Sequence, residues 1–274
     1  MLKDTTFLAS QIRAKKSFLC IGLDPDLEKI PANFHDFDQP FFEFCHEVVK
    51  ITSHLTVAYK INIAFFEALG PDGWIQLEKL VKVIPDECLL IADAKRSDIG
   101  NTSKKYAEYF FNRLGADAVT LNPYMGMDSL EPFFQYNDKW SIVLALTSNP
   151  GAADFELKHT DKGDYFFEEV LKTFEASIYK DNIMYVVGAT KAEYLRKVRQ
   201  HCPSSFLLIP GVGEQGGDLK QVILDGRNFT EGLLINVGRK ILYPKSMNPT
   251  MRDVLTAAED YQSQMADFFL KLNG

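Results

Sequence analysis

The stretch Leu89-Leu90-Ile91-Ala92-Asp93-Ala94-Lys95-Arg96-Ser97-Asp98 decides how this chain is interpreted. Its first four residues are an apolar run, which predicts a buried strand. Because side chains alternate along a strand, Asp93 and Lys95 are expected to point the same way. Asp98 follows in a polar segment, so two carboxylates bracket one lysine at the end of a strand. That spacing can hold an ammonium group charged, oriented and ready to give up a proton.

Seven further β-rich apolar runs accompany this one, separated by longer segments with helical patterning. The eight runs are Phe18–Leu23, Val57–Ile61, Leu89–Ala92, Ala118–Leu121, Ile142–Leu146, Met184–Val187, Phe206–Ile209 and Leu233–Ile235. The helical segments include Trp74–Val83, Thr102–Leu114, Tyr165–Ile178, Ala192–His201 and Arg252–Leu272. This alternation predicts an α/β fold, a (β/α)8 TIM barrel that forms a single domain over residues 1–274. A doubly wound open sheet is the alternative, because strand count alone cannot prove closure.

Composition narrows the classes of function. The 274 residues carry a net charge of −7, which argues against a nucleic-acid-binding surface. The four cysteines, Cys20, Cys45, Cys88 and Cys202, form no C-x-x-C pair, so we expect reduced thiols in a cytoplasmic protein. No apolar run approaches the roughly 18 residues of a membrane span. Residues 1–6 lack the apolar core of a signal peptide.

A barrel places its reactive groups at the C-terminal ends of the strands, and the sequence satisfies that demand. Polar residues follow every predicted strand, and two strands deliver a lysine. These segments hold Asp24, then Lys60 and Asn62, then Asp93 and Lys95, then Asn122, Thr147-Ser148-Asn149, Thr190, Gly211–Asp218, and Asn236-Val237-Gly238-Arg239. Polar loops are common after strands, so no single loop identifies a site. The evidence is that polar residues follow all eight predicted strands and would meet at one end of the barrel.

The loops after the seventh and eighth predicted strands have the features of a phosphate site. Barrels commonly bind phosphate there, and glycines let backbone N–H groups approach an anion. Arg239 adds a fork of donors suited to phosphate oxygens. The alternative is that Gly211, Gly213, Gly216 and Gly217 only make a tight turn. Residues 211–216 also match a dinucleotide G-x-G-x-x-G pattern, but they do not open a βαβ series, so we reject a nicotinamide cofactor.

The motifs together resemble the orotidine 5'-phosphate decarboxylase family. The resemblance rests on Asp93-x-Lys95-x-x-Asp98, on Lys60 upstream, and on the segments 147–151, 210–218 and 237–239. It extends from Gly22 to Arg239. The form Asp-Ala-Lys-Arg-x-Asp-Ile-Gly, the 147–151 segment and the chain length suggest the longer bacterial type, type 2.

The resemblance implies a reaction and a role for each site residue. Orotidine 5'-phosphate would lose CO2 from C6 and become UMP, the last step of pyrimidine nucleotide synthesis, without a metal or an organic cofactor. Lys95 would protonate C6, Asp93 would lie beside the substrate carboxylate, and Lys60 would pair with Asp93. The expected substrate contacts are Asp24 to the ribose, Ser148 to the pyrimidine, Gln215 between base and phosphate, and Gly238 and Arg239 to the phosphate.

The resemblance also implies a homodimer with an active site shared across the interface. In the family, the second aspartate of the motif reaches the ribose of the partner's site, and a threonine lies beside it. Carried over, Asp98 and Thr102 would complete the neighbouring site. The alternative is that Asp98 only caps the helix that follows it, since aspartate is a favoured N-cap residue.

Three other functions stay open on the sequence alone. A sister enzyme of the superfamily could use Asp93 and Lys95 on a sugar phosphate with Mg2+. An aldolase could form a Schiff base on Lys95 or Lys60. A non-catalytic barrel could bind a phosphorylated ligand.

For Lys104, Lys105, Lys191 and Lys240 we expect solvated side chains. The segments 210–218 and 152–164 are the candidates for a mobile lid.

Overall fold

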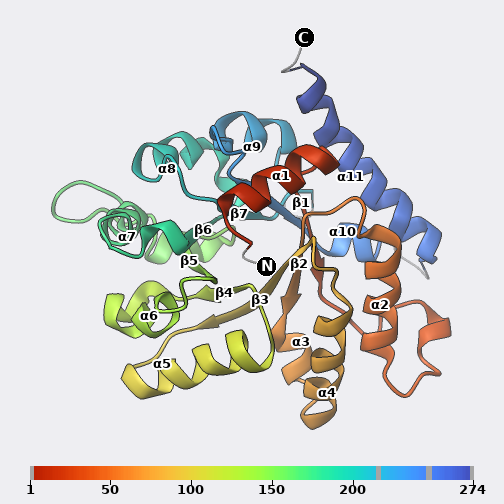
Figure 1. The fold of residues 1–274 in the computed structure, drawn as a ribbon. Helices are drawn as coiled ribbons and strands as arrows, with labels where there is room; N and C mark the ends of the chain where they lie inside the picture. The colour runs from red at the N-terminus through yellow and green to blue at the C-terminus, as the bar shows by residue number, and fades with distance from the viewer. Residues whose placement is uncertain (1–2, 214–216, 245–248, 272–274) are drawn as a thin grey trace.

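Eight parallel strands form a closed barrel in sequential order (Figure 1), in a computed structural model that describes residues 3–213, 217–244 and 249–271. The strands are β1 (Leu19–Leu23), β2 (Ala58–Asn62), β3 (Leu89–Arg96), β4 (Ala118–Leu121), β5 (Trp140–Leu146), β6 (Ile183–Val187), β7 (Leu207–Pro210) and β8 (Leu233–Val237). Each matches a predicted run. Pairing of β8 with β1 closes the sheet and confirms the TIM barrel over the open-sheet alternative.

Helices surround the barrel. They are α1 (Thr5–Lys15), α2 (Pro40–Thr52), α3 (Ile63–Glu67), α4 (Pro71–Leu80), α5 (Gly100–Ala107), α6 (Met127–Phe134), α7 (Phe166–Glu175), α8 (Leu195–His201), α9 (Leu219–Gly226), α10 (Arg239–Leu242) and α11 (Met251–Lys271). Short 3-10 turns occur at Ala32–Phe34, Val81–Val83, Pro123–Met125, Pro150–Asp154, Lys180–Asn182 and Ala189–Tyr194. The predicted helix over 102–114 is α5 followed by a π-helical segment at Glu108–Arg113.

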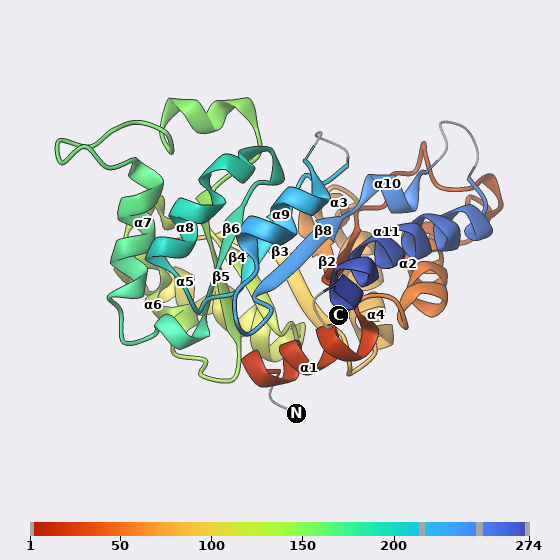
Figure 2. The ribbon, with the colours of Figure 1, turned by 90° about the horizontal axis from the view of Figure 1, so that it is seen from above.

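The N-terminal end of the barrel is covered by α1, which lies opposite α10 in Figure 2. Leu8 and Ile12 of α1 are fully buried. Lys3 donates to the carbonyl of Cys88 at 2.7 Å and pairs with Asp117 at 2.7 Å, just before β3 and β4. In TIM barrels this face serves stability, and the opposite face carries chemistry. The loops after the strands are therefore the place to look for a site.

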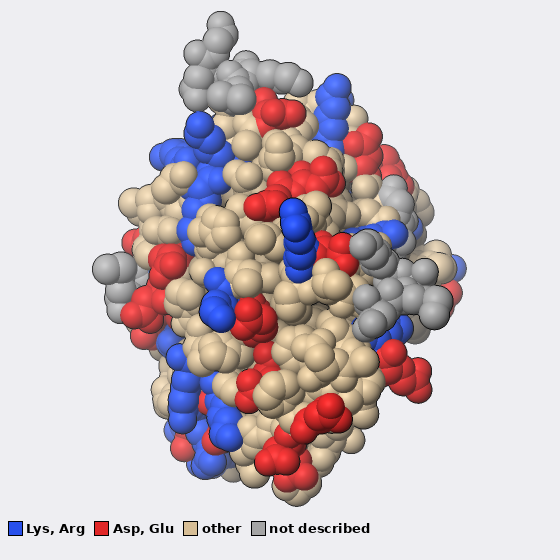
Figure 3. Space-filling view, turned by 90° about the vertical axis from the view of Figure 1, so that its right-hand side faces the viewer, with Lys and Arg blue, Asp and Glu red and all other residues tan. Residues whose placement is uncertain are grey.

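The surface charge, the cysteines and the helices each bear on the kind of protein. On the face shown in Figure 3, acidic and basic side chains are interspersed and neither sign covers the face. Cys20, Cys45, Cys88 and Cys202 are buried and free. Among the helices of the described residues, none has the length and apolar character needed to cross a membrane.

Candidate active site

A cavity of about 290 Å³ opens at the C-terminal ends of the strands. Every strand, or the residue that follows it, contributes to the lining. The polar lining residues are Asp24, Lys60, Asn62, Asp93, Lys95, Thr120, Thr147, Ser148, Asn149, Asn236, Arg239 and Lys240, and the apolar ones include Leu144, Val186 and Leu208. An enclosed pocket with a few convergent polar groups is typical of a small-molecule site.

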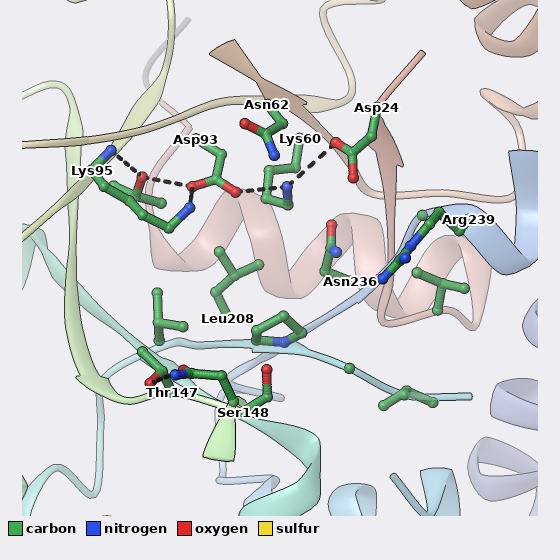
Figure 4. A pocket seen from close by; sticks show the side chains of 18 of the residues that line it. Asp24, Lys60, Asn62, Asp93, Lys95, Thr147, Ser148, Leu208, Asn236 and Arg239 are labelled. Atoms are coloured by element: carbon green, nitrogen blue, oxygen red, sulfur yellow. Dashed lines mark hydrogen bonds and ion pairs between the residues drawn. The ribbon is translucent and has the colours of Figure 1, made fainter. Parts of the chain in front are cut away.

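Four charged side chains form a row along one side of this cavity (Figure 4). Lys60 Nζ lies 2.9 Å from Asp93 Oδ2 and 3.9 Å from Asp24 Oδ1. On the other side of Asp93, Lys95 Nζ lies 2.6 Å from Oδ1. One carboxylate oxygen of Asp24 is buried and accepts no hydrogen bond from the described residues. The row thus alternates in sign from Asp24 to Lys95.

Burial and neighbouring charge act in opposite directions on this row. Burial would raise the pKa of Asp93, but the ammonium groups of Lys60 and Lys95 outweigh it and hold that pKa well below its usual value. Burial would lower the pKa of Lys60, which is 5% exposed, but Asp93 and Asp24 reverse that effect and raise the pKa. Both groups are therefore charged at neutral pH. The Lys95 side chain is 51% exposed and reaches solvent as well as Asp93.

The loop after β5 places Ser148 across the cavity from this charged row (Figure 4). Glu156 accepts from the backbone N–H of Thr147 at 2.6 Å and from its hydroxyl at 2.9 Å. Thr190 donates to the carbonyl of Ser148 at 3.0 Å. A Cβ on Gly188 would lie 2.5 Å from Ser148 Cα, so only glycine lets the two backbones approach this closely. Ser148 is thus held by the loop after β6 as well as by its own.

The far end of the cavity is built by the loops after β7 and β8. Gly238 precedes α10, and Arg239 begins it, at the opposite end of the cavity from Lys95 (Figure 4). Gly213 has a φ of +78°, and a Cβ there would lie 2.2 Å from the Tyr261 hydroxyl of α11. Two constraints therefore require glycine at this position. Gln215 lies outside the described residues, as does the middle of the predicted lid at 210–218.

Lys240 follows Arg239 and also lines the cavity, although its side chain is exposed. The sequence suggested a solvated side chain with no part in the site. The structure instead adds a second cation at the end where a phosphate is expected, because α10 begins immediately after β8.

Asp98 and Thr102 do not line the cavity that holds the other predicted residues. Asp98 Oδ1 accepts from the N–H of Ile99 at 2.7 Å, and α5 begins at Gly100 with no side-chain cap. The capping alternative is therefore wrong. The initial picture of Lys95 between Asp93 and Asp98 is also wrong for one chain, because Lys60 and Lys95 instead flank Asp93.

Several lining residues carry no role in the sequence-based prediction: Asn62, Thr120, Leu144, Thr147, Val186, Leu208 and Asn236. Thr120 had a usable signal, since it is a hydroxyl within an apolar strand run. Asn62 ends β2 and Asn236 lies one residue before the end of β8, where polar residues are common and indicate no particular role. The apolar residues had no signal, because barrel cores contain many similar side chains. Among the described residues, no group of three or more His, Cys, Asp or Glu side chains is placed to hold a metal ion.

A closed (β/α)8 barrel with an alternating charged row and glycine-rich loops defines a class of barrel enzymes that act on phosphorylated small molecules. Within that class, the model of the Orotidine 5'-phosphate decarboxylase / HUMPS family matches residues 17–253. The chain belongs to this family.

Relatives of known name and solved structures match this chain along nearly its whole length. The orotidine 5'-phosphate decarboxylase of Flavobacterium johnsoniae is 48% identical over 266 residues, covering 96% of this chain and 97% of the relative. That of Bacteroides fragilis is 46% identical, with 95% and 96% covered. Among solved structures, the OMP decarboxylase of Leishmania donovani is 34% identical with a TM-score of 0.82, and covers 96% of this chain and 97% of its own.

Proposed function

We propose that this protein is an orotidine 5'-phosphate decarboxylase, which converts orotidine 5'-phosphate to UMP and CO2 in pyrimidine nucleotide synthesis. The full-length relatives that carry this name support the assignment. They do not support the alternative of a magnesium-dependent sister enzyme. The observation that carries the proposal is the charged row Asp24–Lys60–Asp93–Lys95, with Ser148 opposite and Arg239 at the far end of the cavity.

The charged row suits the loss of CO2. As the bond between C6 and the carboxylate breaks, its electron pair stays on C6. The Lys95 ammonium stabilises that charge and then donates a proton to C6, so the substrate takes up one proton and releases CO2. Solvent can reprotonate Lys95, because half of its side chain is exposed. Hydrogen bonds within the protein already orient the row, and electrostatic stabilisation is strongest where the charged groups are preorganised.

Asp93 has two roles in this proposal. It orients the Lys95 ammonium at 2.6 Å, and it places a carboxylate beside the leaving carboxylate of the substrate. Lys60 keeps Asp93 ionised despite burial. Repulsion between the two carboxylates would ease as CO2 departs, but we assign the larger effect to stabilisation of the carbanion.

The remaining residues recognise the nucleotide. We assign Asp24 to a ribose hydroxyl, because it lines the cavity at the end of the charged row away from Lys95. Ser148 would hydrogen-bond the pyrimidine, Gln215 would bridge base and phosphate, and Gly238 and Arg239 would bind the phosphate. Lys240 would add charge at that end. The binding energy of the phosphate can favour closure of the site over the distant C6.

We further propose a homodimer in which Asp98 and Thr102 complete the partner's site. Both residues lie outside the cavity of their own chain. On the loops after β3 and β4, at the same end of the barrel, Ile99, Tyr124 and Met125 are exposed. Apolar side chains exposed together are typical of an interface.

Three further assignments complete the proposal: the domain organisation, the cellular location and the subtype. We infer a single decarboxylase domain over residues 1–274, since α11 contacts α2 and α10, and α1 buries Leu8 and Ile12 in the same hydrophobic core as the strands. We place the protein in the cytoplasm, where free cysteines stay reduced. We retain the longer bacterial type, type 2, as a prediction.

The test of the function follows the absorbance of orotidine 5'-phosphate mixed with the purified protein, with UMP measured as the product. We expect turnover at the same rate with and without EDTA, and none of a phosphorylated sugar acid. Turnover of the sugar acid dependent on Mg2+ would favour the sister enzyme. A reduced adduct on Lys95 or Lys60 after borohydride treatment would favour an aldolase. No turnover by wild-type protein would refute the proposal.

A further inference from the structure

Lys95 has an unusual backbone conformation for a reactive residue at the end of a strand. Its φ is +49°, in the left-handed region that side chains other than glycine rarely adopt. The pairing of β3 with β4 shifts register between Ala92 and Arg96, so the strand bulges here. Such a conformation is strained and persists only where neighbours enforce it. The question is which group enforces it.

The hydroxyl of Thr120 is that group. It accepts from the backbone N–H of Ala94 and from that of Lys95, each at 2.9 Å. It donates to Asp93 Oδ1, also at 2.9 Å. A threonine hydroxyl has one donor and two acceptor lone pairs, so Thr120 uses its full capacity on three successive residues of the reactive strand. Thr120 is 1% exposed, so its hydroxyl is almost completely shielded from bulk water.

The opposite side of the same peptide is held as well. Arg96 donates from Nη1 to the carbonyl of Ala94 at 2.8 Å, and its guanidinium pairs with Glu67 of α3. The residue preceding Lys95 is thus fixed at its N–H by β4 and at its carbonyl by β3. The same Asp93 oxygen that binds Thr120 also binds Lys95 Nζ. Backbone and side chain of Lys95 are therefore oriented through one hydroxyl.

We propose that Thr120 is a positioning residue for decarboxylation, which locks the left-handed turn at Lys95 and the carboxylate of Asp93 in their reactive geometry. The catalytic effect rests on the function proposed above. Thr120 acts through Asp93 and Lys95. Its loss should therefore lower kcat far more than it raises KM, because the nucleotide contacts at Asp24, Ser148 and Arg239 stay in place.

The first test compares three substitutions that differ in the hydroxyl. Thr120→Val keeps the shape and removes the hydroxyl, so kcat should fall about 30- to 100-fold, as expected for displaced reacting groups. KM should change less than about threefold. Thr120→Ser should keep kcat within about threefold. Thr120→Cys matches serine in size but hydrogen-bonds weakly, so its kcat should be about tenfold below that of the serine variant.

A matched control separates positioning from general stability. Thr56 is also fully buried, and its hydroxyl donates to the carbonyls of Leu19 and Ala58 at the start of β1 and β2. Thr56→Val should lower Tm but leave kcat within about twofold. The proposal is overturned if the Thr56 and Thr120 valine variants lose activity alike. It is also overturned if the cysteine and serine variants of Thr120 have equal kcat, a comparison that remains available if Thr120→Val does not fold.

Crystal structures of wild type and Thr120→Cys give a readout that needs no turnover. We expect Lys95 to leave the left-handed region in the variant, with Nζ displaced from Asp93. An unchanged Lys95 backbone would refute the positioning role even if the protein has another activity. Conversely, inactive wild-type protein with a displaced Lys95 in the variant would refute the proposed function and leave the positioning role intact.

Discussion

At the scale of single residues, the site depends on a carboxylate that stays ionised while buried. Asp93 contacts two ammonium groups and one hydroxyl, so each of its oxygens has a charged partner. Removing one member of such a pair leaves an uncompensated buried charge, which typically costs about 3–5 kcal/mol. The charged row therefore also determines how the free energy of unfolding changes as the pH falls.

The first prediction concerns that response. The pKa of Asp93 in the folded protein lies below its ordinary value of 3.8. As the pH falls, Asp93 therefore takes up a proton in the unfolded chain at a higher pH than in the folded protein. The stabilisation by Asp93 should be complete above pH 3.8 and decline below it, by about 1.4 kcal/mol per pH unit for the one proton. Urea unfolding of wild type and Asp93→Asn between pH 5 and about 2.5 measures this. The variant should show a slope shallower by that amount, and equal slopes would contradict the account.

The family resemblance correctly implied the pair of Lys60 with Asp93, but neither it nor the local sequence predicted the bulge at Lys95. Alternation along a strand correctly put Asp93 and Lys95 on one side. The physical reason is different, since Lys95 departs from strand geometry and is turned back by Thr120. A bulge depends on a contact with the neighbouring strand, and local sequence carries no record of that contact.

At the scale of elements, the loops after β5 and β6 must fit against each other to present Ser148. The sequence showed the polar segment 147–151, but the need for glycine at position 188 arises only when two loops from different strands meet. Such close approaches depend on tertiary structure, and a lone glycine in a sequence can equally mark a turn, a bulge or a helix end.

The second prediction tests this contact. A Cβ in Gly188→Ala would meet backbone atoms of Ser148 at 2.5 and 2.6 Å, so the Ser148 loop must shift. We expect a loss of about 1–3 kcal/mol in the free energy of unfolding, together with an increase in KM of roughly tenfold because the base contact is displaced. Steady-state kinetics and urea unfolding measure both quantities.

Gly226→Ala is the matched control. A Cβ there would meet only side-chain carbons of Leu233 and Leu195 at 3.1 Å or more, and the position is remote from the cavity. This variant should keep the wild-type KM. A wild-type KM in Gly188→Ala would show that Ser148 does not bind the pyrimidine in the assigned way.

At the scale of the whole molecule, the barrel was predictable because its periodicity is strong. All eight strands lie within a few residues of the predicted runs, whereas the named helical segments did not include α1, α2, α3, α6, α9 or α10. Strands buried on both faces produce continuous apolar runs. Short helices with a single buried stripe produce weaker signals, and closure of the sheet is a property that no individual run reveals.

The third prediction addresses the shared site. Mixing inactive Lys95→Ala with inactive Asp98→Ala should restore activity, because in the proposed homodimer a hybrid would hold one site with Lys95 from one chain and Asp98 from the other. Random exchange in an equal mixture predicts roughly a quarter of wild-type activity per site. The control mixture of Lys95→Ala with Asp93→Ala should stay inactive, since both residues belong to one chain's cavity. Equal inactivity of the two mixtures would place Asp98 outside the partner's site.

The most direct measurement of the central claim is the kcat of Lys95→Ala with orotidine 5'-phosphate, beside Lys105→Ala as the control. Lys105 is exposed and pairs with Glu108 on the outside of the barrel, so its loss should leave kcat unchanged. Loss of the group that we propose to stabilise and protonate C6 should lower kcat at least about a thousandfold. A Lys95→Ala enzyme within tenfold of wild type would contradict the account.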